Sequence, residues 1–243
     1  RRTRDFLENS INPTTGEPYL KKIDLMLFGE HDDDAIPLEG YLKQAYQKAQ
    51  EFCSLLSKRV KAGGFMSTLM LKRIGSTILS GENTAKKMLA WTEEGRQILV
   101  DEFDFTFEDD DDDDENYSEV KELTIEETEC LRELVRILSM NRDSDPKYGK
   151  VLEILQKGTG ENDIPWKERG CIIFSQYFDS AHFLAENLSK DIPDTVIGLY
   201  AGGDKSGGYF NMKFEKMSKD DIKALVKERK IKILVGTDAA SEG

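Results

Sequence analysis

The stretch RGCIIFSQYFDSAHFLAENLSKDIPDTVIGLYAGG, residues 169–203, decides the fold class of this chain. It alternates a short apolar strand at 171–174, an amphipathic helix at about 180–188 and a second apolar strand at 195–200. A further helix and a third strand at 231–235 follow. Continuous apolar strands separated by helices predict an α/β fold with a parallel sheet that helices cover on both faces.

Upstream of this stretch the sequence predicts helices. GYLKQAYQKAQEFCSLLSKRVKAGG, residues 40–64, carries apolar residues at helical spacing, and Gly63 and Gly64 predict the end of that helix. Two more helices are expected within residues 65–95, because apolar residues recur there in steps of three and four.

Two helix starts have specific local signals. Thr124 and Glu127 form a T-x-x-E capping box, which predicts that a helix begins after Thr124. Asp145 precedes Pro146, and this pair predicts a capped helix with proline in its first turn.

The acidity of the chain is concentrated in one segment. The formal net charge is −13, but residues 101–115, DEFDFTFEDDDDDDE, hold eleven acidic side chains and no basic one. Removing eleven negative charges from −13 leaves −2, so the net charge does not exclude a nucleic-acid partner. We interpret residues 103–118 as a solubilising acidic tether between helices. The alternative is that this segment competes with DNA or binds a basic partner.

The cysteines and histidines argue against disulfide and metal chemistry. The three cysteines lie far apart, are odd in number and form no C-x-x-C pair, and His31 and His182 have no neighbours at ligand spacing. No apolar run approaches the roughly 18 residues of a membrane span, and the start, RRTRDFLENS, has neither an initiator Met nor a signal sequence. We therefore predict a cytoplasmic protein without a metal site.

Polar clusters follow two of the predicted strands. FSQYFDSA, residues 174–181, follows the first strand, and GTDAASEG, residues 236–243, follows the third. Ligands bind beyond the carboxyl ends of the strands in open parallel sheets, although either cluster alone also fits an ordinary connection.

In their order along the chain, these clusters resemble a known motor family. The segments DPKYGKVLEIL (145–155), CIIFSQYFDSA (171–181), GLYAGG (198–203), SKDDIK (218–223) and ILVGTDAASEG (233–243) resemble the second RecA-like domain of superfamily-two helicases. The nearest resemblance is to the Swi/Snf-like branch and its bacterial helicase-like ATPases. CIIFSQYFDSA is similar to helicase motif IV, and VGTDAASEG is similar to motif V.

The resemblance implies a domain organisation. RRTRDFL (1–7) resembles the segment that leaves the first RecA-like domain, and LMLKRIGSTI (69–78) resembles a helix of the bacterial helical insertion. We expect a fragment with three parts: a connection over 1–40, a helical insertion over 41–143, and the first half of the second RecA-like domain over 144–243. The last part would be a partial parallel sheet with flanking helices.

The resemblance also assigns residues to the nucleic-acid side of the site. Thr237 matches the motif V threonine that contacts a nucleic-acid phosphate, a task suited to a hydroxyl and a backbone N–H. Ser175 and Gln176 match motif IV and are placed with Thr237. The alternative for Ser175 is a simple helix cap.

Other motif V residues are assigned to the nucleotide side. Asp238, Glu242 and Gly243 lie where that motif turns toward the nucleotide, and the alternative for Asp238 is a cap of the following helix. Lys219 stands where relatives often have arginine and is our candidate for an inter-domain contact.

The function implied by the resemblance is that of a piece of an ATP-dependent DNA translocase. ATP, Mg²⁺, duplex DNA and the first RecA-like domain are then partners of the full-length parent. The chain holds no G-x-x-x-x-G-K-[ST] phosphate loop and no acidic box after a strand. We therefore expect no catalytic residue, no bound ATP and no ATPase activity in this chain alone. The alternative is a non-catalytic interaction module whose acidic loop binds basic partners.

Two further segments carry glycine-rich and basic patterns. GLYAGGDKSGG, residues 198–208, lacks the ending of a phosphate loop, and we expect a flexible loop over the site. Lys72, Arg73, Lys86 and Lys87 form a basic helical cluster that either meets a DNA backbone or is a solvated face.

Overall fold

The structure is a computed structural model that describes residues 4–20, 27, 29, 35–60, 63–90, 123–159 and 164–237. The chain divides into two compact units, Arg1–Pro37 and Leu38–Gly243. The predicted acidic tether over 103–118 and three predicted site residues, Asp238, Glu242 and Gly243, lie outside the described residues.

The first unit contains a short helix and a tight reversal of the chain. Helix α1 spans Arg4–Asn9, and an antiparallel bridge joins Ile11 to Pro18. The turn between them is closed by Asn12, whose backbone N–H donates to the Glu17 carbonyl at 2.8 Å. Gly16 has a φ of +72°, which suits glycine in this turn.

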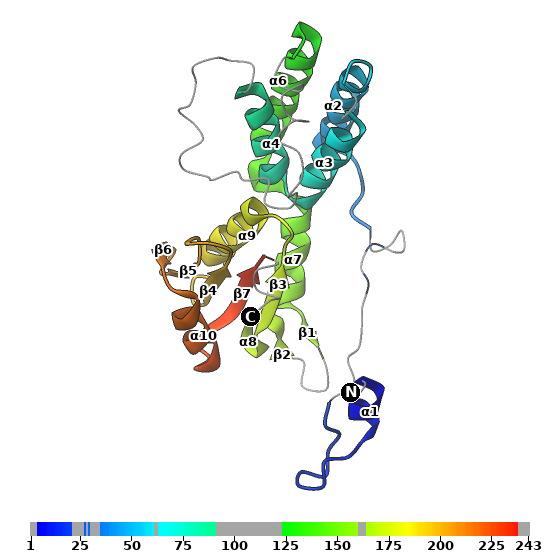
Figure 1. The fold of residues 1–243 in the computed structure, drawn as a ribbon. Helices are drawn as coiled ribbons and strands as arrows, with labels where there is room; N and C mark the ends of the chain where they lie inside the picture. Colours follow the sequence, from blue (N-terminus) through cyan, green and yellow to red (C-terminus); the bar gives the residue numbers. More distant parts are fainter. Residues whose placement is uncertain are drawn as a thin grey trace. The chain divides into compact units, whose positions relative to one another are not determined.

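Four helices of the second unit share one apolar core (Figure 1). They are α2 (Gly40–Ser57), α3 (Gly63–Ser76), α4 (Ile78–Ala90) and α6 (Ile125–Ser139). The core contains Phe52, Leu56, Met70, Met88 and Leu134, all with no exposed surface. The helical periodicity of the sequence is confirmed here, since its apolar stripes supply these buried side chains.

One predicted helix start is confirmed, and one predicted helix end is not. The Thr124 hydroxyl accepts the Glu127 N–H at 3.2 Å, and the Glu127 carboxylate accepts the Thr124 N–H at 2.8 Å, so the capping box is confirmed. The prediction that Gly63 and Gly64 end a helix was wrong. Helix α2 already ends at Ser57, and the two glycines begin α3.

The rest of the second unit combines helices with a sheet. Its helices are η2 (Arg142–Ser144), α7 (Pro146–Gln156), α8 (Trp166–Arg169), α9 (Phe178–Asp191) and α10 (Lys219–Lys227). Its strands are β1 (Gly158–Thr159), β2 (Ile164–Pro165), β3 (Cys171–Phe174), β4 (Val196–Tyr200), β5 (Gly207–Phe210), β6 (Lys213–Lys216) and β7 (Ile231–Gly236). Asp145 caps α7 by accepting the Lys147 N–H at 2.9 Å, as predicted.

The five-stranded sheet is mixed rather than parallel, which corrects the sequence prediction. Its order is β3-β7-β4-β5-β6: β3, β7 and β4 run parallel, and β5 and β6 are antiparallel to their neighbours. The connection from Tyr200 to Gly207 is too short for a crossover helix, so β5 must return antiparallel to β4. Part of the predicted loop over 198–208 is therefore strand.

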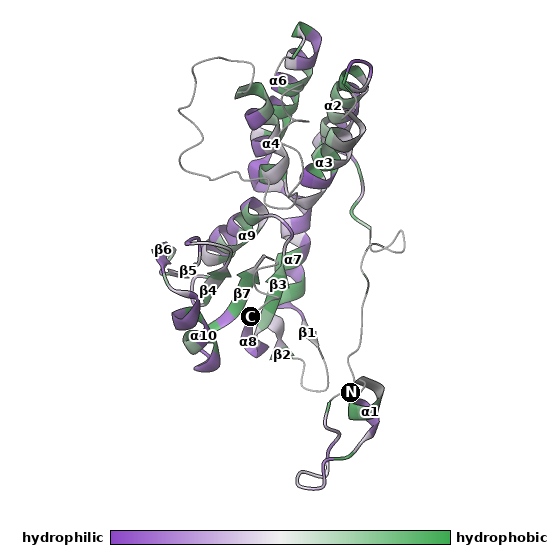
Figure 2. Cartoon of the chain, viewed as in Figure 1, coloured by the Kyte–Doolittle hydropathy of each residue, from purple (hydrophilic) through white to green (hydrophobic). Residues whose placement is uncertain are grey.

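Helices cover both faces of the three parallel strands. On one face, α7 and α9 pack on Ile197, Leu199, Ile233 and Val235. On the other, Ile222 of α10 packs on Ile231 and Leu234. Figure 2 shows β3 and β7 as hydrophobic between these more hydrophilic helices.

Within the described residues, every helix is too short or too polar to cross a lipid bilayer.

Candidate functional site

The carboxyl ends of the three parallel strands meet at one edge of the sheet. Gly236 at the end of β7 pairs with Phe174 of β3 on one side and with Tyr200 of β4 on the other. The Ser175 N–H donates to the Gly236 carbonyl at 2.9 Å, and the Thr237 N–H donates to the Tyr200 carbonyl at 3.1 Å. The structure therefore brings together two predicted site residues that are 62 positions apart in the sequence.

Ser175 lies at the edge and is not a helix cap. Helix α9 begins at Phe178, its capping position is Tyr177, and no side chain caps it. The Ser175 hydroxyl instead donates to the Tyr177 carbonyl over a long 3.4 Å. Gln176 is exposed beside it. The cap alternative for Ser175 is thus excluded, and both side chains lie where an external ligand can reach them.

Thr237 has fewer groups free to bind a ligand than the sequence predicted. Its backbone N–H donates to the Tyr200 carbonyl, so the hydrogen-bonding capacity of that N–H is already satisfied within the sheet. The Thr237 side chain is half-buried. A phosphate at this position would meet the hydroxyl and not the amide.

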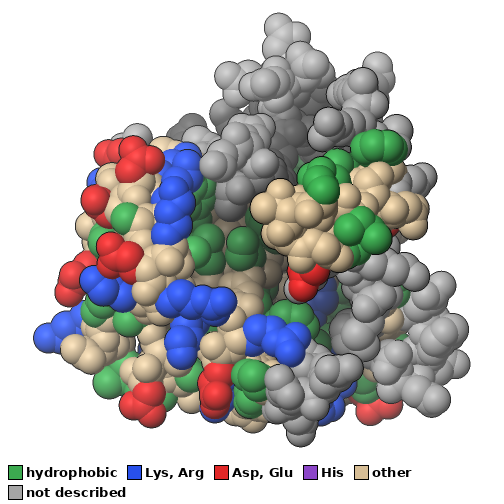
Figure 3. Space-filling model, turned by 90° about the horizontal axis from the view of Figure 1, so that it is seen from below, with side chains coloured by type: hydrophobic (Ala, Val, Ile, Leu, Met, Phe, Trp, Pro, Cys, Tyr) green, Lys and Arg blue, Asp and Glu red, His purple; other side chains and the backbone are tan. Residues whose placement is uncertain are grey.

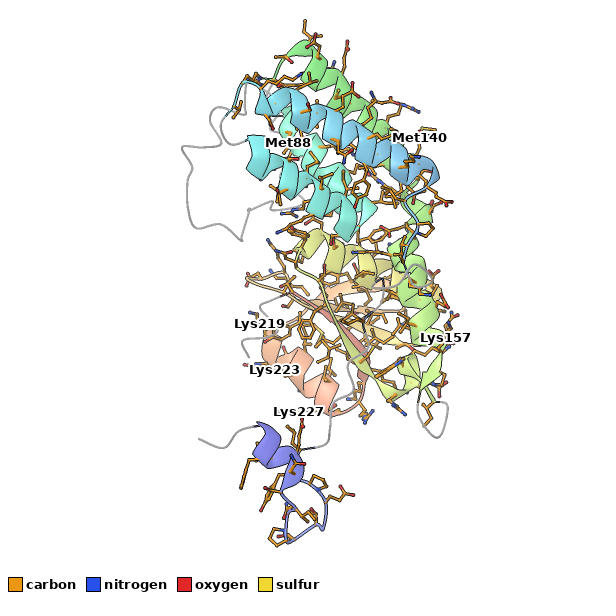
Figure 4. The ribbon with its side chains drawn as sticks, turned by 90° about the vertical axis from the view of Figure 1, so that its right-hand side faces the viewer. Met88, Met140, Lys157, Lys219, Lys223 and Lys227 are labelled. Atoms are coloured by element: carbon orange, nitrogen blue, oxygen red, sulfur yellow. The ribbon has the colours of Figure 1, made fainter. Side chains whose placement is uncertain are left out.

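Lys219 lies beside the same edge, because its ammonium group is close to the ring of Tyr200. The Tyr200 ring is buried, and the ammonium groups of Lys219 and Lys223 lie 5.3 Å and 5.9 Å from its centroid. Both distances are within the range of about 6 Å for cation–π attraction. Figure 4 shows Lys219, Lys223 and Lys227 along α10, where a spacing of four places them on one side of the helix.

The sequence reasoning missed Tyr200 and Lys223. Tyr200 links two predicted residues, since its carbonyl holds Thr237 and its ring attracts Lys219. The available signal was an aromatic residue at the end of a predicted strand, with lysines four apart on the next helix. Only the packing of α10 on β4 connects them.

The loop after β4 is closed at the same edge by one side chain. The Ser206 hydroxyl accepts the Ala201 N–H at 3.0 Å and donates to the Ala201 carbonyl at 2.9 Å. Gly203 within the loop has a φ of +56°. The predicted flexible loop over the site is therefore a short loop tied at its base.

The charge around the edge differs from that of the whole chain. Residues 166–237 contain twelve Lys and Arg and ten Asp and Glu, a balance of +2, while the whole chain carries −13. Figure 3 shows lysine and arginine side chains gathered on one face among scattered acidic ones. An anionic ligand is therefore not repelled locally.

The basic helical cluster predicted upstream lies only partly at the surface, since Lys72 and Lys86 are exposed but Arg73 is buried. Arg73 is only 7% exposed and pairs with Asp179, and the Lys86 ammonium pairs with the buried Glu82 at 2.7 Å. Arg73 is therefore excluded from direct contact with a DNA backbone. In the part of the chain that the structure describes, no group of three or more His, Cys, Asp or Glu side chains is placed to hold a metal ion.

Searches of protein-family models, curated proteins and solved structures find no match to this chain.

Proposed function

We propose that this chain is part of an ATP-dependent DNA translocase of the helicase type, and that the edge formed by Ser175, Thr237 and Tyr200 meets the nucleic-acid backbone. One observation carries the proposal. The motif IV-like and motif V-like segments lie side by side, joined by the hydrogen bond from the Ser175 N–H to the Gly236 carbonyl at 2.9 Å. Two small hydroxyl side chains and nearby ammonium groups suit phosphate oxygens.

The parallel part of the sheet further supports a RecA-like arrangement. Strands β3, β7 and β4 run parallel with helices on both faces, and polar residues follow the carboxyl ends of β3 and β7. ATP and Mg²⁺ belong in this proposal to the full-length parent, where a second RecA-like domain would face the edge. We expect this chain alone to show no ATP turnover, with or without duplex DNA.

The second function, an acidic interaction module, has no structural observation in its favour. Its argument rests on residues 108–115, which the structure does not describe. It predicts that deletion of these residues abolishes capture of a basic partner, whereas the translocase proposal predicts that DNA binding survives.

The proposal is tested by fluorescence anisotropy of a labelled 20-base-pair duplex over a series of salt concentrations. Thr237→Val keeps the shape of the side chain and removes the hydroxyl, and should weaken binding about tenfold at low salt. Lys219→Ala should also reduce the slope of log K against log salt by about 0.9, as expected for one lost phosphate contact.

Lys227→Ala is the matched control, because Lys227 has the same charge on the same helix and is exposed. It should change affinity less than Lys219→Ala. Equal effects of the two lysine variants, with no effect of Thr237→Val, would show non-specific attraction and contradict the proposed site.

A further inference from the structure

The helices α3 and α4 meet the α/β part of the second unit through polar side chains. The helical core and the sheet core share no residue, although α4 contacts α9. In Figure 1 the four helices lie on one side of α9 and the sheet lies on the other. The two cores are therefore joined by specific hydrogen bonds and ion pairs rather than by continuous apolar packing.

Arg73 of α3 is a buried cation at this junction. Its guanidinium carbon lies 3.9 Å from the centroid of the Tyr177 ring, and its Nη1 lies 3.3 Å from Asp179 Oδ1. Arg73 and Asp179 are 7% and 6% exposed. A planar guanidinium can stack on a ring and pair with a carboxylate at the same time, which an ammonium does less well.

The pair is incompletely satisfied. Among the described residues, Arg73 Nε and Asp179 Oδ2 find no hydrogen-bond partner. Burial raises the pKa of the Asp179 carboxyl above its ordinary value, although Arg73 opposes this. A buried ion pair with unmet polar atoms is a poor source of stability, so its presence calls for another reason.

Neighbouring hydroxyls extend the same junction. Ser76 Oγ and Thr77 Oγ1 lie 2.8 Å and 3.0 Å from Ser180 Oγ in α9. Asp145 Oδ2 accepts the Ile78 N–H at 2.7 Å and so ties the first turn of α4 to the cap of α7. The C-terminal end of α3 and the N-terminal end of α4 are thus held against the start of α9.

The contact leads from Arg73 directly to the edge of the sheet. Tyr177, on which Arg73 stacks, is 5% exposed. Its carbonyl accepts a hydrogen bond from the Ser175 hydroxyl at 3.4 Å. Ser175 in turn donates its N–H to Gly236, the residue before Thr237. Only one residue, Gln176, therefore separates Tyr177, which contacts the buried guanidinium, from Ser175, which carries one of the two proposed phosphate-binding hydroxyls.

We propose that Arg73 is a positioning residue that couples helices α3 and α4 to the Ser175–Tyr177 loop and so sets the position of Ser175 at the nucleic-acid edge. The role of this coupling in nucleic-acid binding rests on the proposed function. The effect of Arg73 on the position of Ser175 does not. A shift of the two helices moves the ring of Tyr177, and with it the backbone that carries Ser175.

Amide hydrogen exchange tests the structural step without DNA. Arg73→Met together with Asp179→Asn removes both charges, so neither is left buried and unpaired. This double variant should accelerate exchange of the Ser175 amide by about tenfold or more and leave α6 amides unchanged. Arg73→Lys, which keeps a charge over Tyr177, should return the Ser175 rate to within about threefold of the unsubstituted chain.

Arg142→Met is the matched control. Arg142 pairs with Glu82 of α4 at 2.6 Å, and this ion pair includes none of the residues 175–177. It should lower global stability without a selective change at Ser175. Equal acceleration by Arg142→Met, or an unchanged Ser175 rate in the double variant, would overturn the coupling.

Duplex DNA binding separates this proposal from the proposed function. The double variant should bind the labelled duplex about three- to tenfold more weakly with an unchanged salt slope, because no phosphate contact is removed. Faster Ser175 exchange with unchanged DNA affinity would overturn the positioning role. Absence of DNA binding by every form, with faster Ser175 exchange, would contradict the proposed function and leave the coupling established.

Discussion

At the scale of single residues, Tyr200 organises the edge of the sheet. Its carbonyl accepts the Thr237 N–H, and its buried ring attracts the ammonium groups of Lys219 and Lys223. An aromatic face attracts an ammonium group but carries no negative charge, so it leaves both lysines able to pair with an external anion. One strand-end residue therefore brings a hydroxyl and two cations to the same place.

Ser206 gives a prediction at this scale. Because its hydroxyl satisfies both backbone groups of the buried Ala201, Ser206→Ala leaves a donor and an acceptor unpaired. We expect a loss of about 2 kcal/mol in the free energy of unfolding, measured by urea denaturation. Ser57→Ala is the control, since the exposed Ser57 hydroxyl only adds a bond to the Cys53 carbonyl. A loss no larger than that of the control would refute this role of Ser206.

At the scale of elements, the β5–β6 hairpin is held by an unusual turn. Asn211 and Met212 connect the strands with φ values of 49° and 65°. Two central residues with positive φ are typical of a type I′ turn, which matches the twist of the strands. Asparagine tolerates this conformation, but methionine is strained in it.

Met212→Gly should therefore stabilise the protein. The Met212 side chain is 57% exposed, so little packing is lost, and glycine adopts positive φ without a steric cost. We expect a gain of about 1 kcal/mol in the free energy of unfolding. Met212→Ala provides the comparison, because alanine removes the same long side chain and keeps the strain. Equal stability of the two variants would show that the turn stores no strain.

At the scale of the whole second unit, buried carboxylates tie separate helices together. Glu82 of α4 has no exposed side-chain surface and accepts hydrogen bonds from Arg142, and it also pairs with Lys86. Glu127 of α6 pairs with Arg59 at 2.5 Å. Burial raises the pKa of Glu82, but the bonds from Arg142 and Lys86 outweigh it and hold the pKa below its ordinary value.

The lowered pKa gives a pH-dependent prediction. A carboxyl with a lowered folded-state pKa contributes stability above its ordinary pKa of about 4.3 and loses it as pH falls through the folded value. At neutral pH, Glu82→Gln should cost about 1.5 kcal/mol, a moderate value because Arg142 and Lys86 remain partly in water.

Thermal unfolding of both forms between pH 7 and pH 3 measures this effect, and the two curves should converge toward the acid end. Glu133→Gln is the control, because Glu133 pairs with Arg136 on the surface of α6 and should cost less at every pH. A constant difference between Glu82→Gln and the unsubstituted chain across this range would contradict the ionic account.

The sequence alone predicted those features whose signals act over a few residues. The capping box at Thr124, the Asp145–Pro146 helix start and the strand over 171–174 are all confirmed. The sequence also predicted that Ser175 and Thr237 lie at one edge of the sheet, and this is confirmed, because parallel strands bring their carboxyl ends to the same edge.

Other features depended on the tertiary structure. The β5–β6 hairpin was missed because glycines and a positive-φ methionine give no strand or turn signal of the usual kind. Arg73 was interpreted as part of a surface cluster, yet its partner Asp179 lies 106 positions away in the sequence. Helical periodicity specifies which side of a helix is apolar, but a buried ion pair is decided by which helices pack together, and that requires the assembled cores.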